Sequence, residues 1–107
     1  MTETKKQIWK PGTMLNPVPA VMVSCRGADG STNIMTAAWA GVLCSEPSYV
    51  YVSIRPSRRS YDMIKETGEY VINLTTEDLA AAADFCGVKS GRDTDKWEAC
   101  GLTEGKA

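Results

Sequence analysis

Short apolar runs separated by turn residues dominate the chain from residue 20 to residue 74. Four of them, rich in β-branched or aromatic residues, predict strands at 20–25, 32–36, 49–54 and 70–74. The Asp29-Gly30 pair between the first two is typical of a tight hairpin turn. Residues 37–44 continue the second run with small and apolar side chains. The pattern indicates an antiparallel β core.

Two segments carry the pattern of helices. Residues 60–68 start at Ser60, a favourable N-cap residue, and end at Gly68. Residues 76–85 open with a capping threonine and two acids and continue with strong helix formers. The fold class is therefore mainly β with inserted helices, which suits a small barrel or an α+β sheet better than a parallel βαβ fold.

The ends of the chain are less regular. Residues 10–19 contain three prolines, which predicts an extended segment after a polar leader at 1–10. From residue 86 the chain is Gly-rich and charged, with Trp97 and Leu102 as its large apolar anchors. A length of 107 residues with 43% hydrophobic and 23% charged residues fits one domain, 1–107, around one core.

The charge distribution and the N-terminal sequence limit the expected partners and the expected location of the protein. The 12 basic and 13 acidic residues are spread along the chain and give a net charge of −1, so nucleic acid is not an expected partner. The N-terminal residues show neither a signal peptide nor an apolar stretch long enough for a bilayer. We expect a cytoplasmic protein with no membrane partner.

The cysteine and histidine content indicates that any catalysis by this chain would depend on a cofactor. The four cysteines form no C-x-x-C pair, so we expect reduced, mostly buried thiols and no metal site. Histidine is absent, which removes Ser-His and Cys-His catalysis and histidine-ligated metals. An enzyme built on this chain would take its reactivity from a cofactor.

A phosphate-binding segment is one candidate site. Guanidinium groups, hydroxyls and free backbone N–H groups converge just before the predicted helix, at Arg55, Ser57, Arg58, Arg59 and Ser60. The same residues also fit a solvated loop with an ordinary serine cap. Both interpretations stay open.

A second candidate site would accept a flat ring. Residues 33–39 offer an extended backbone with small side chains at Ala37 and Ala38, flanked by amide and hydroxyl groups. The segment fits plain barrel core equally well. No G-x-G-x-x-G or P-loop pattern occurs, which excludes a Rossmann cofactor domain, so NAD(P)H would have to dock transiently over a bound flavin.

The order of the segments resembles the flavin reductase-like family, flavoredoxin branch. The matching segments are 19–24, 33–39, 46–47, 51–56, 60–64, 67–74 and 95–97. The resemblance spans residues 11–102 and implies an FMN-binding split β-barrel. It also implies noncovalent FMN and a homodimer with the flavin near the subunit interface. The family's domain continues past residue 103 with strands that complete the barrel, so we expect an incomplete barrel here.

The resemblance also assigns residues. Its flavin-contacting strand matches Asn33, Met35, Thr36, Ala37 and Ala38, and its phosphate region matches Ser53, Ile54, Arg55 and Ser60. Arg58 and Arg59 are secondary candidates because family members vary there. Asn73 is expected to hold strands together.

The implied function is that of an FMN-dependent oxidoreductase. In this hypothesis NAD(P)H reduces the flavin, and electrons pass to a second acceptor, either a small molecule or a protein. Two alternatives stay open. The chain could be a flavoredoxin-like electron carrier reduced by a partner protein, or a truncated interaction module without catalysis.

Overall fold

The structure is a computed structural model and describes residues 5–106. Its central sheet has three antiparallel strands in the order β2-β1-β5: β1 (Val21–Arg26), β2 (Thr32–Ala37) and β5 (Val71–Leu74). Val23 lies opposite both Met35 and Ile72. The predicted hairpin turn joins β1 to β2, and Gly30 there takes a φ of 86° that favours glycine. Asn73 ties β5 to β1, since its side-chain amide donates to the Met22 carbonyl and to the Ser24 hydroxyl.

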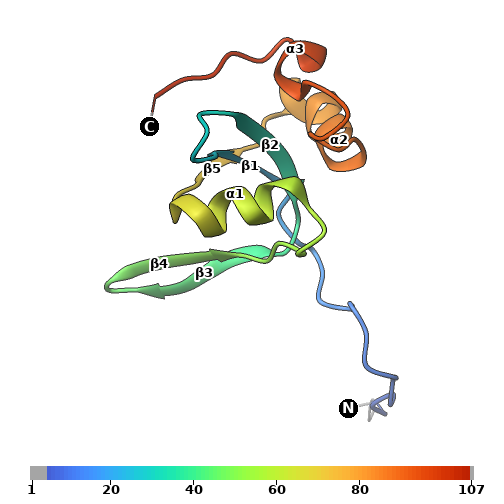
Figure 1. Cartoon of the computed structure of the whole chain (residues 1–107). Helices are drawn as coiled ribbons and strands as arrows, with labels where there is room; N and C mark the ends of the chain where they lie inside the picture. The colour runs from blue at the N-terminus through green and yellow to red at the C-terminus, as the bar shows by residue number, and fades with distance from the viewer. Residues whose placement is uncertain (1–4, 107) are drawn as a thin grey trace.

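A separate two-stranded sheet is formed by β3 (Ala40–Ser45) and β4 (Ser48–Val52). Figure 1 shows this hairpin projecting to one side of the body, beneath α1. Two expectations need correction. Residues 40–45 form a strand that the sequence did not predict, and β4 ends at Val52, so Ser53 and Ile54 lie beyond it.

Helix α1 (Arg59–Thr67) begins one residue before the prediction. Arg58 occupies the N-cap position without a side-chain cap, so the assignment of Ser60 as the cap is wrong. Ser60 is instead fully buried. Gly68 ends the helix as predicted, with a φ of 75° and its N–H donated to the Ile64 carbonyl.

The other helices follow β5. A 3-10 turn, η1 (Glu77–Leu79), leads into α2 (Ala80–Val88), and Thr76 makes no side-chain cap, contrary to expectation. A short helix, α3 (Lys96–Cys100), was not predicted. Asp95 caps it by accepting hydrogen bonds from the backbone N–H groups of Trp97 and Glu98.

The two faces of the central sheet carry two apolar clusters. One consists of Val21, Val23, Met35 and Ala37, packed against α1 and the start of the β3–β4 hairpin. The other consists of Met22, Ile34, Ala83 and Cys86, packed against α2 and α3. The expected anchors Trp97 and Leu102 contact this second cluster. All four cysteines are free thiols, and the expectation of burial fails at Cys44, which is exposed.

The molecule is elongated, with extents of 61, 32 and 25 Å. Figure 1 shows residues 5–20 running away from the body. Within residues 5–106 the two sheets do not close a barrel, which confirms a mainly β fold with helices and an open barrel. None of the helices in this range has the length and apolar character needed to cross a membrane.

Candidate functional site: a cationic pocket beside strand β2

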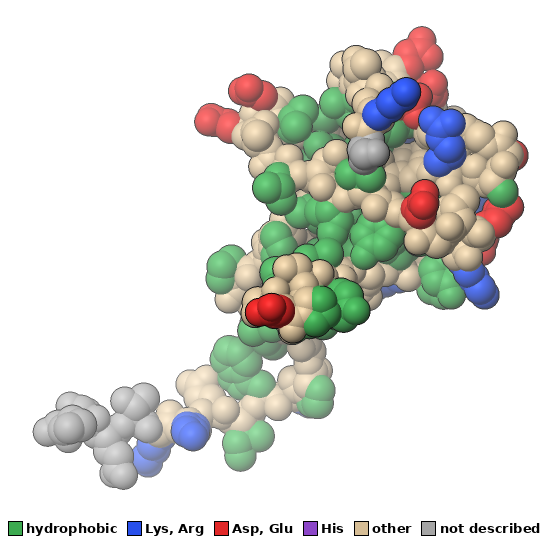
Figure 2. Space-filling model, turned by 90° about the vertical axis from the view of Figure 1, so that its left-hand side faces the viewer, with side chains coloured by type: hydrophobic (Ala, Val, Ile, Leu, Met, Phe, Trp, Pro, Cys, Tyr) green, Lys and Arg blue, Asp and Glu red, His purple; other side chains and the backbone are tan. Residues whose placement is uncertain are grey.

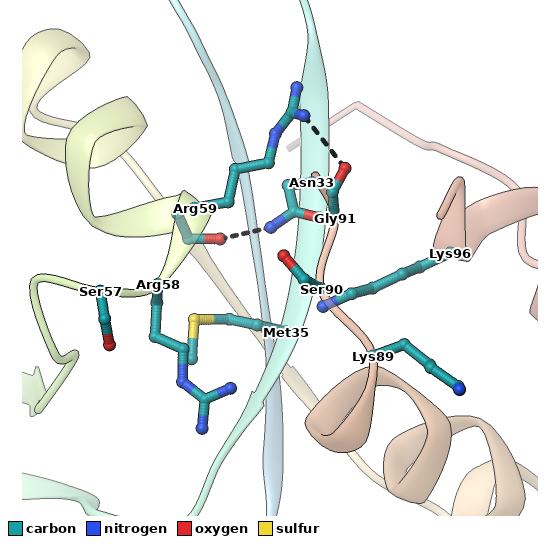
Figure 3. A pocket seen from close by; sticks show the side chains of 10 residues that line it. Asn33, Met35, Ser57, Arg58, Arg59, Lys89, Ser90, Gly91 and Lys96 are labelled. Carbon is teal, nitrogen blue, oxygen red and sulfur yellow. Dashed lines mark hydrogen bonds between the residues drawn. The ribbon is translucent and has the colours of Figure 1, made fainter. Parts of the chain in front are cut away.

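A pocket of about 130 Å³ lies between β2, the start of α1 and the connection from α2 to α3. Its ten lining residues are Asn33, Met35, Ser57, Arg58, Arg59, Ser60, Lys89, Ser90, Gly91 and Lys96. Figure 3 shows that these residues come from three parts of the chain, with the Arg58 and Lys89 side chains extending in different directions. Four of the ten are cationic and none is acidic. The pocket therefore has the charge expected of an anion site.

The start of α1 adds to this positive potential. The N-cap residue Arg58 offers no side-chain acceptor to the first N–H groups of the helix. Two arginines, Arg58 and Arg59, stand where the helix dipole favours acidic groups. A bound anion would satisfy the free N–H groups and offset the repulsion among these cations.

Lys96 is the most deeply placed of the cations. Its side chain is 3% exposed, and its Nζ donates to the Cys86 carbonyl oxygen at 2.9 Å. Burial lowers the pKa of Lys96, and the nearby charge of Arg58 acts in the same direction. Figure 3 shows the side chain reaching from α3 toward Ser90. A buried ammonium whose hydrogen bond, within residues 5–106, goes to a carbonyl is costly and would gain from a negative partner.

A polar network holds the pocket walls together. The side-chain amide of Asn33 donates to the Ser60 hydroxyl at 2.9 Å, which joins β2 to α1. Nη1 of Arg59 donates to the Gly91 carbonyl at 3.0 Å, which joins α1 to the α2–α3 connection (Figure 3). Gly91 lies so close to Asn33 that a Cβ there would be 2.1 Å from Asn33 Oδ1.

A larger hollow of about 460 Å³ adjoins this pocket and shares Asn33, Arg59 and Gly91 with it. Its remaining residues include Trp97 and the acids Asp93, Asp95 and Glu104. The acids make it a poorer place for a phosphate than the first pocket.

The residues expected along β2 divide between the two faces of the sheet. Asn33 and Met35 line the cationic pocket. Thr36 faces the opposite way and donates its hydroxyl to the Ala83 carbonyl in α2. Ala37 is buried in the α1-side cluster, and Ala38 is half-buried. A flat ligand could therefore reach the backbone here, but not the Ala37 side chain.

The residues expected to bind phosphate are not all brought together. Ser60 lines the pocket, although its hydroxyl already binds Asn33. Arg55 lies outside the lining and is exposed, with its guanidinium carbon 5.9 Å from the centre of the Trp39 ring. Ser53 donates its N–H to the Trp39 carbonyl, and Ile54 packs against the α1-side cluster. The secondary candidates Arg58 and Arg59 are the arginines in the pocket.

Four lining residues were not anticipated as site residues: Lys89, Ser90, Gly91 and Lys96. The signals available were weak. Asp95-Lys96-Trp97-Glu98 has the spacing of a helix capping box, and Lys89-Ser90-Gly91 is a basic turn like many others.

Comparison with known proteins decides the family. The family model described as the flavin reductase like domain matches residues 13–107. The chain belongs to this family. An uncharacterised protein of Archaeoglobus fulgidus is 37% identical over 71 residues, which cover 66% of this chain and 40% of that protein.

Solved structures agree with this assignment. Flavoredoxin of Desulfovibrio vulgaris (Miyazaki F) is similar with a TM-score of 0.84 and 35% identity, covering 92% of this chain and 54% of that one. An FMN-binding domain of a flavin reductase-like enzyme from Shewanella baltica OS155 has a TM-score of 0.73 and 30% identity, covering 78% of this chain and 44% of that one. This chain thus has the FMN-binding fold of flavin reductase-like proteins and spans about half the length of these relatives.

Proposed function

We propose that this protein binds FMN, with the FMN phosphate in the cationic pocket, and serves as an FMN-dependent oxidoreductase. The observation that carries the proposal is the meeting of four cationic side chains with an uncapped helix N-terminus, in a pocket whose described lining has no acid. This arrangement fits a dianionic phosphate. The named FMN-binding relative, at 30% identity, supports the same cofactor.

The pocket residues have separable roles in this proposal. Arg58 and Lys89 are exposed and would approach the phosphate from its open side. Lys96 would meet it from the buried side, and Arg59 fixes Gly91 in the wall. The backbone from Asn33 to Ala38, along β2 and one residue beyond it, would run along the flavin ring, with Met35 as an apolar contact.

The cofactor supplies the redox chemistry: a bound FMN can take a hydride from NAD(P)H and pass the electrons to a second acceptor. The protein's part is to hold the phosphate, present the β2 backbone and shield one side of the ring. The similarity to flavoredoxin favours a second candidate, an electron carrier reduced by a partner protein. NAD(P)H oxidation by the FMN-loaded protein supports the reductase, and reduction that requires a protein donor supports the carrier.

Binding of FMN and riboflavin by charge variants tests the phosphate site. We expect Arg58→Met and Lys89→Met each to weaken FMN roughly tenfold or more, because each removes a charge-assisted contact. Riboflavin lacks the phosphate, so its affinity should change little. Lys65→Met is the matched control, since Lys65 is an exposed cation in the last turn of α1, away from the pocket. Equal losses of FMN and riboflavin would contradict the assignment.

A further inference from the structure

Two thiols from different helices meet behind the cationic pocket. Cys86 belongs to α2 and is 1% exposed, in the cluster packed under α3. Cys100 ends α3, is half-buried and packs against this cluster, near enough to Cys86 to raise the pKa of its thiol. The proposed flavin chemistry uses neither thiol.

The chain between the two thiols contains a whole wall of the pocket. Residues 86–100 include four lining residues, Lys89, Ser90, Gly91 and Lys96. Lys96 is also bound to this segment from within, through its hydrogen bond to the Cys86 carbonyl. Any constraint that joins residue 86 to residue 100 therefore acts on the placement of these groups.

We propose that Cys86 and Cys100 form a reversible disulfide by exchange with a low-molecular-weight disulfide, and that this bond fixes the wall of the cationic pocket. A cross-link that closes a loop of this length restricts the loop strongly. The second part of the proposal rests on FMN as the ligand of the pocket, and the first part does not.

The exchange proceeds in two balanced steps. Cys100, the more exposed thiol, loses its proton, and its sulfur attacks the small disulfide to form a mixed disulfide, releasing one small thiolate. The Cys86 thiol then loses its proton, and its sulfur attacks Cys100 Sγ, releasing the second small thiolate. The two protons end on the two released thiolates. Two protein thiols are oxidised, and one small disulfide is reduced to two thiols.

The surroundings of the two thiols set this order. Burial raises the pKa of Cys86 to about 11, and the neighbouring Cys100 adds to the effect, so Cys86 is a poor first nucleophile. The ammonium of Lys96 opposes this rise and lies where it would stabilise the Cys86 thiolate during the second step.

The test uses the full chain with Cys44→Ser, which removes the exposed thiol, and excess oxidised glutathione without flavin. We expect mass spectrometry to show the loss of two hydrogens. Trypsin cuts after Lys89, Arg92 and Lys96, so the bridge should hold together two peptides that otherwise separate. The melting temperature should rise by roughly 10 °C.

Variants of the Cys44→Ser protein in which one further cysteine is replaced test the order of the steps. Cys86→Ser should stop at a glutathione adduct on Cys100. Cys100→Ser should form neither a disulfide nor an adduct at the buried Cys86. Free thiols at both Cys86 and Cys100, or a glutathione adduct on each of these two residues, in the Cys44→Ser protein at excess oxidised glutathione would overturn the proposal.

Binding to the oxidised and reduced Cys44→Ser protein tests the effect on the pocket. A preorganised wall should strengthen FMN binding roughly fivefold and leave riboflavin unchanged. A disulfide with unchanged FMN affinity would overturn the coupling to the pocket. Failure of FMN to bind either form would overturn the proposed function and the coupling, while disulfide formation would still be decided by the mass measurement.

Discussion

Lys96 shows how one residue can be placed for binding at a cost to folding. Its ammonium is removed from water and, within the described residues, donates to the Cys86 carbonyl, while other cations share its pocket. Such a group destabilises the flavin-free protein and becomes favourable when an anion arrives. The proposed phosphate site would therefore account for a lysine that packing alone disfavours.

Stability as a function of pH should report this placement. The pKa of Lys96 in the folded protein is lower than its ordinary value of 10.5. Between the two pKa values the Lys96 side chain of the unfolded chain carries more protons than that of the folded protein. The destabilisation caused by the buried ammonium therefore decreases as pH rises, and it is fully relieved above pH 10.5. Urea unfolding from neutral pH to 10.5 should show that the stability of the wild type, relative to Lys96→Met, increases with pH.

Cys86 titrates nearby with the opposite sign, since its raised pKa means that stability falls as pH increases from 9.0 to about 11. Because the Lys96 ammonium opposes the rise of the Cys86 pKa, Lys96→Met would change this titration as well. The comparison is therefore repeated in a Cys86→Ala background, where the difference between lysine and methionine isolates Lys96. A difference that does not change with pH would show that Lys96 is not destabilised by its surroundings.

Gly91 matters because of what lies against it. A Cβ at this position would sit 2.1 Å from Asn33 Oδ1 and 2.7 Å from Asn33 Cγ, so Gly91→Ala must shift either the Asn33 amide, which is bonded to Ser60, or the backbone at residue 91. We expect a loss of roughly 1–3 kcal/mol in the free energy of unfolding, and weaker FMN binding. Gly105→Ala is the control, since its Cβ would meet nothing within 4 Å. Equal stability of the two variants in urea would contradict this account.

At the scale of elements, the short helix α3 positions Lys96. The contribution of its N-cap residue, Asp95, to stability can be tested directly. Asp95→Ala removes the acceptor of two backbone N–H groups and should cost about 1 kcal/mol of unfolding free energy. The melting temperature should fall by roughly 4–8 °C. Asp95→Asn keeps an acceptor and should lose much less. Asp93→Ala, an exposed acid two residues earlier, should leave stability unchanged.

The sequence predicted those elements whose signals are local. The β1–β2 hairpin has its Asp29-Gly30 turn, and α1 ends at Gly68 as predicted. Strand β3 was missed because Ala40 and Gly41 have low strand propensity and because its pairing with β4 depends on contacts that the local pattern does not show. Helix α3 was missed because five residues are too few for a periodic pattern.

The start of α1 and four residues of the pocket lining escaped prediction for a common reason. Ser60 looked like a cap, but its hydroxyl instead accepts a hydrogen bond from Asn33, 27 residues earlier in the chain. The Arg59–Gly91 bond joins residues 32 positions apart. Local spacing identified the basic segment at 55–60, but long-range contacts decide that Arg58 and Arg59, rather than Arg55, meet Lys89 and Lys96.

At the scale of the whole molecule, the β3–β4 hairpin leaves large apolar side chains exposed. Val42 is 75% exposed and Leu43 64%, and on the paired strand Tyr49, Val50 and Tyr51 are also exposed. Figure 2, which looks toward the tip of this hairpin, shows apolar side chains around it and on the body above. A two-stranded sheet with open edges is marginal by itself and prone to pairing with other chains.

We therefore expect the chain to self-associate through the β3–β4 hairpin, most simply as a two-fold dimer in which each copy covers the other's apolar strands. Light scattering at micromolar concentration should give twice the monomer mass for the wild type. The double variant Val42→Lys, Leu43→Lys should shift the equilibrium to the monomer, since it places two charges on the contact without altering the buried core. Val88→Lys is the matched control, because Val88 is a 71% exposed apolar residue on α2, and it should remain dimeric. A wild type that is monomeric and binds no apolar dye would show that these strands are stable without a partner copy.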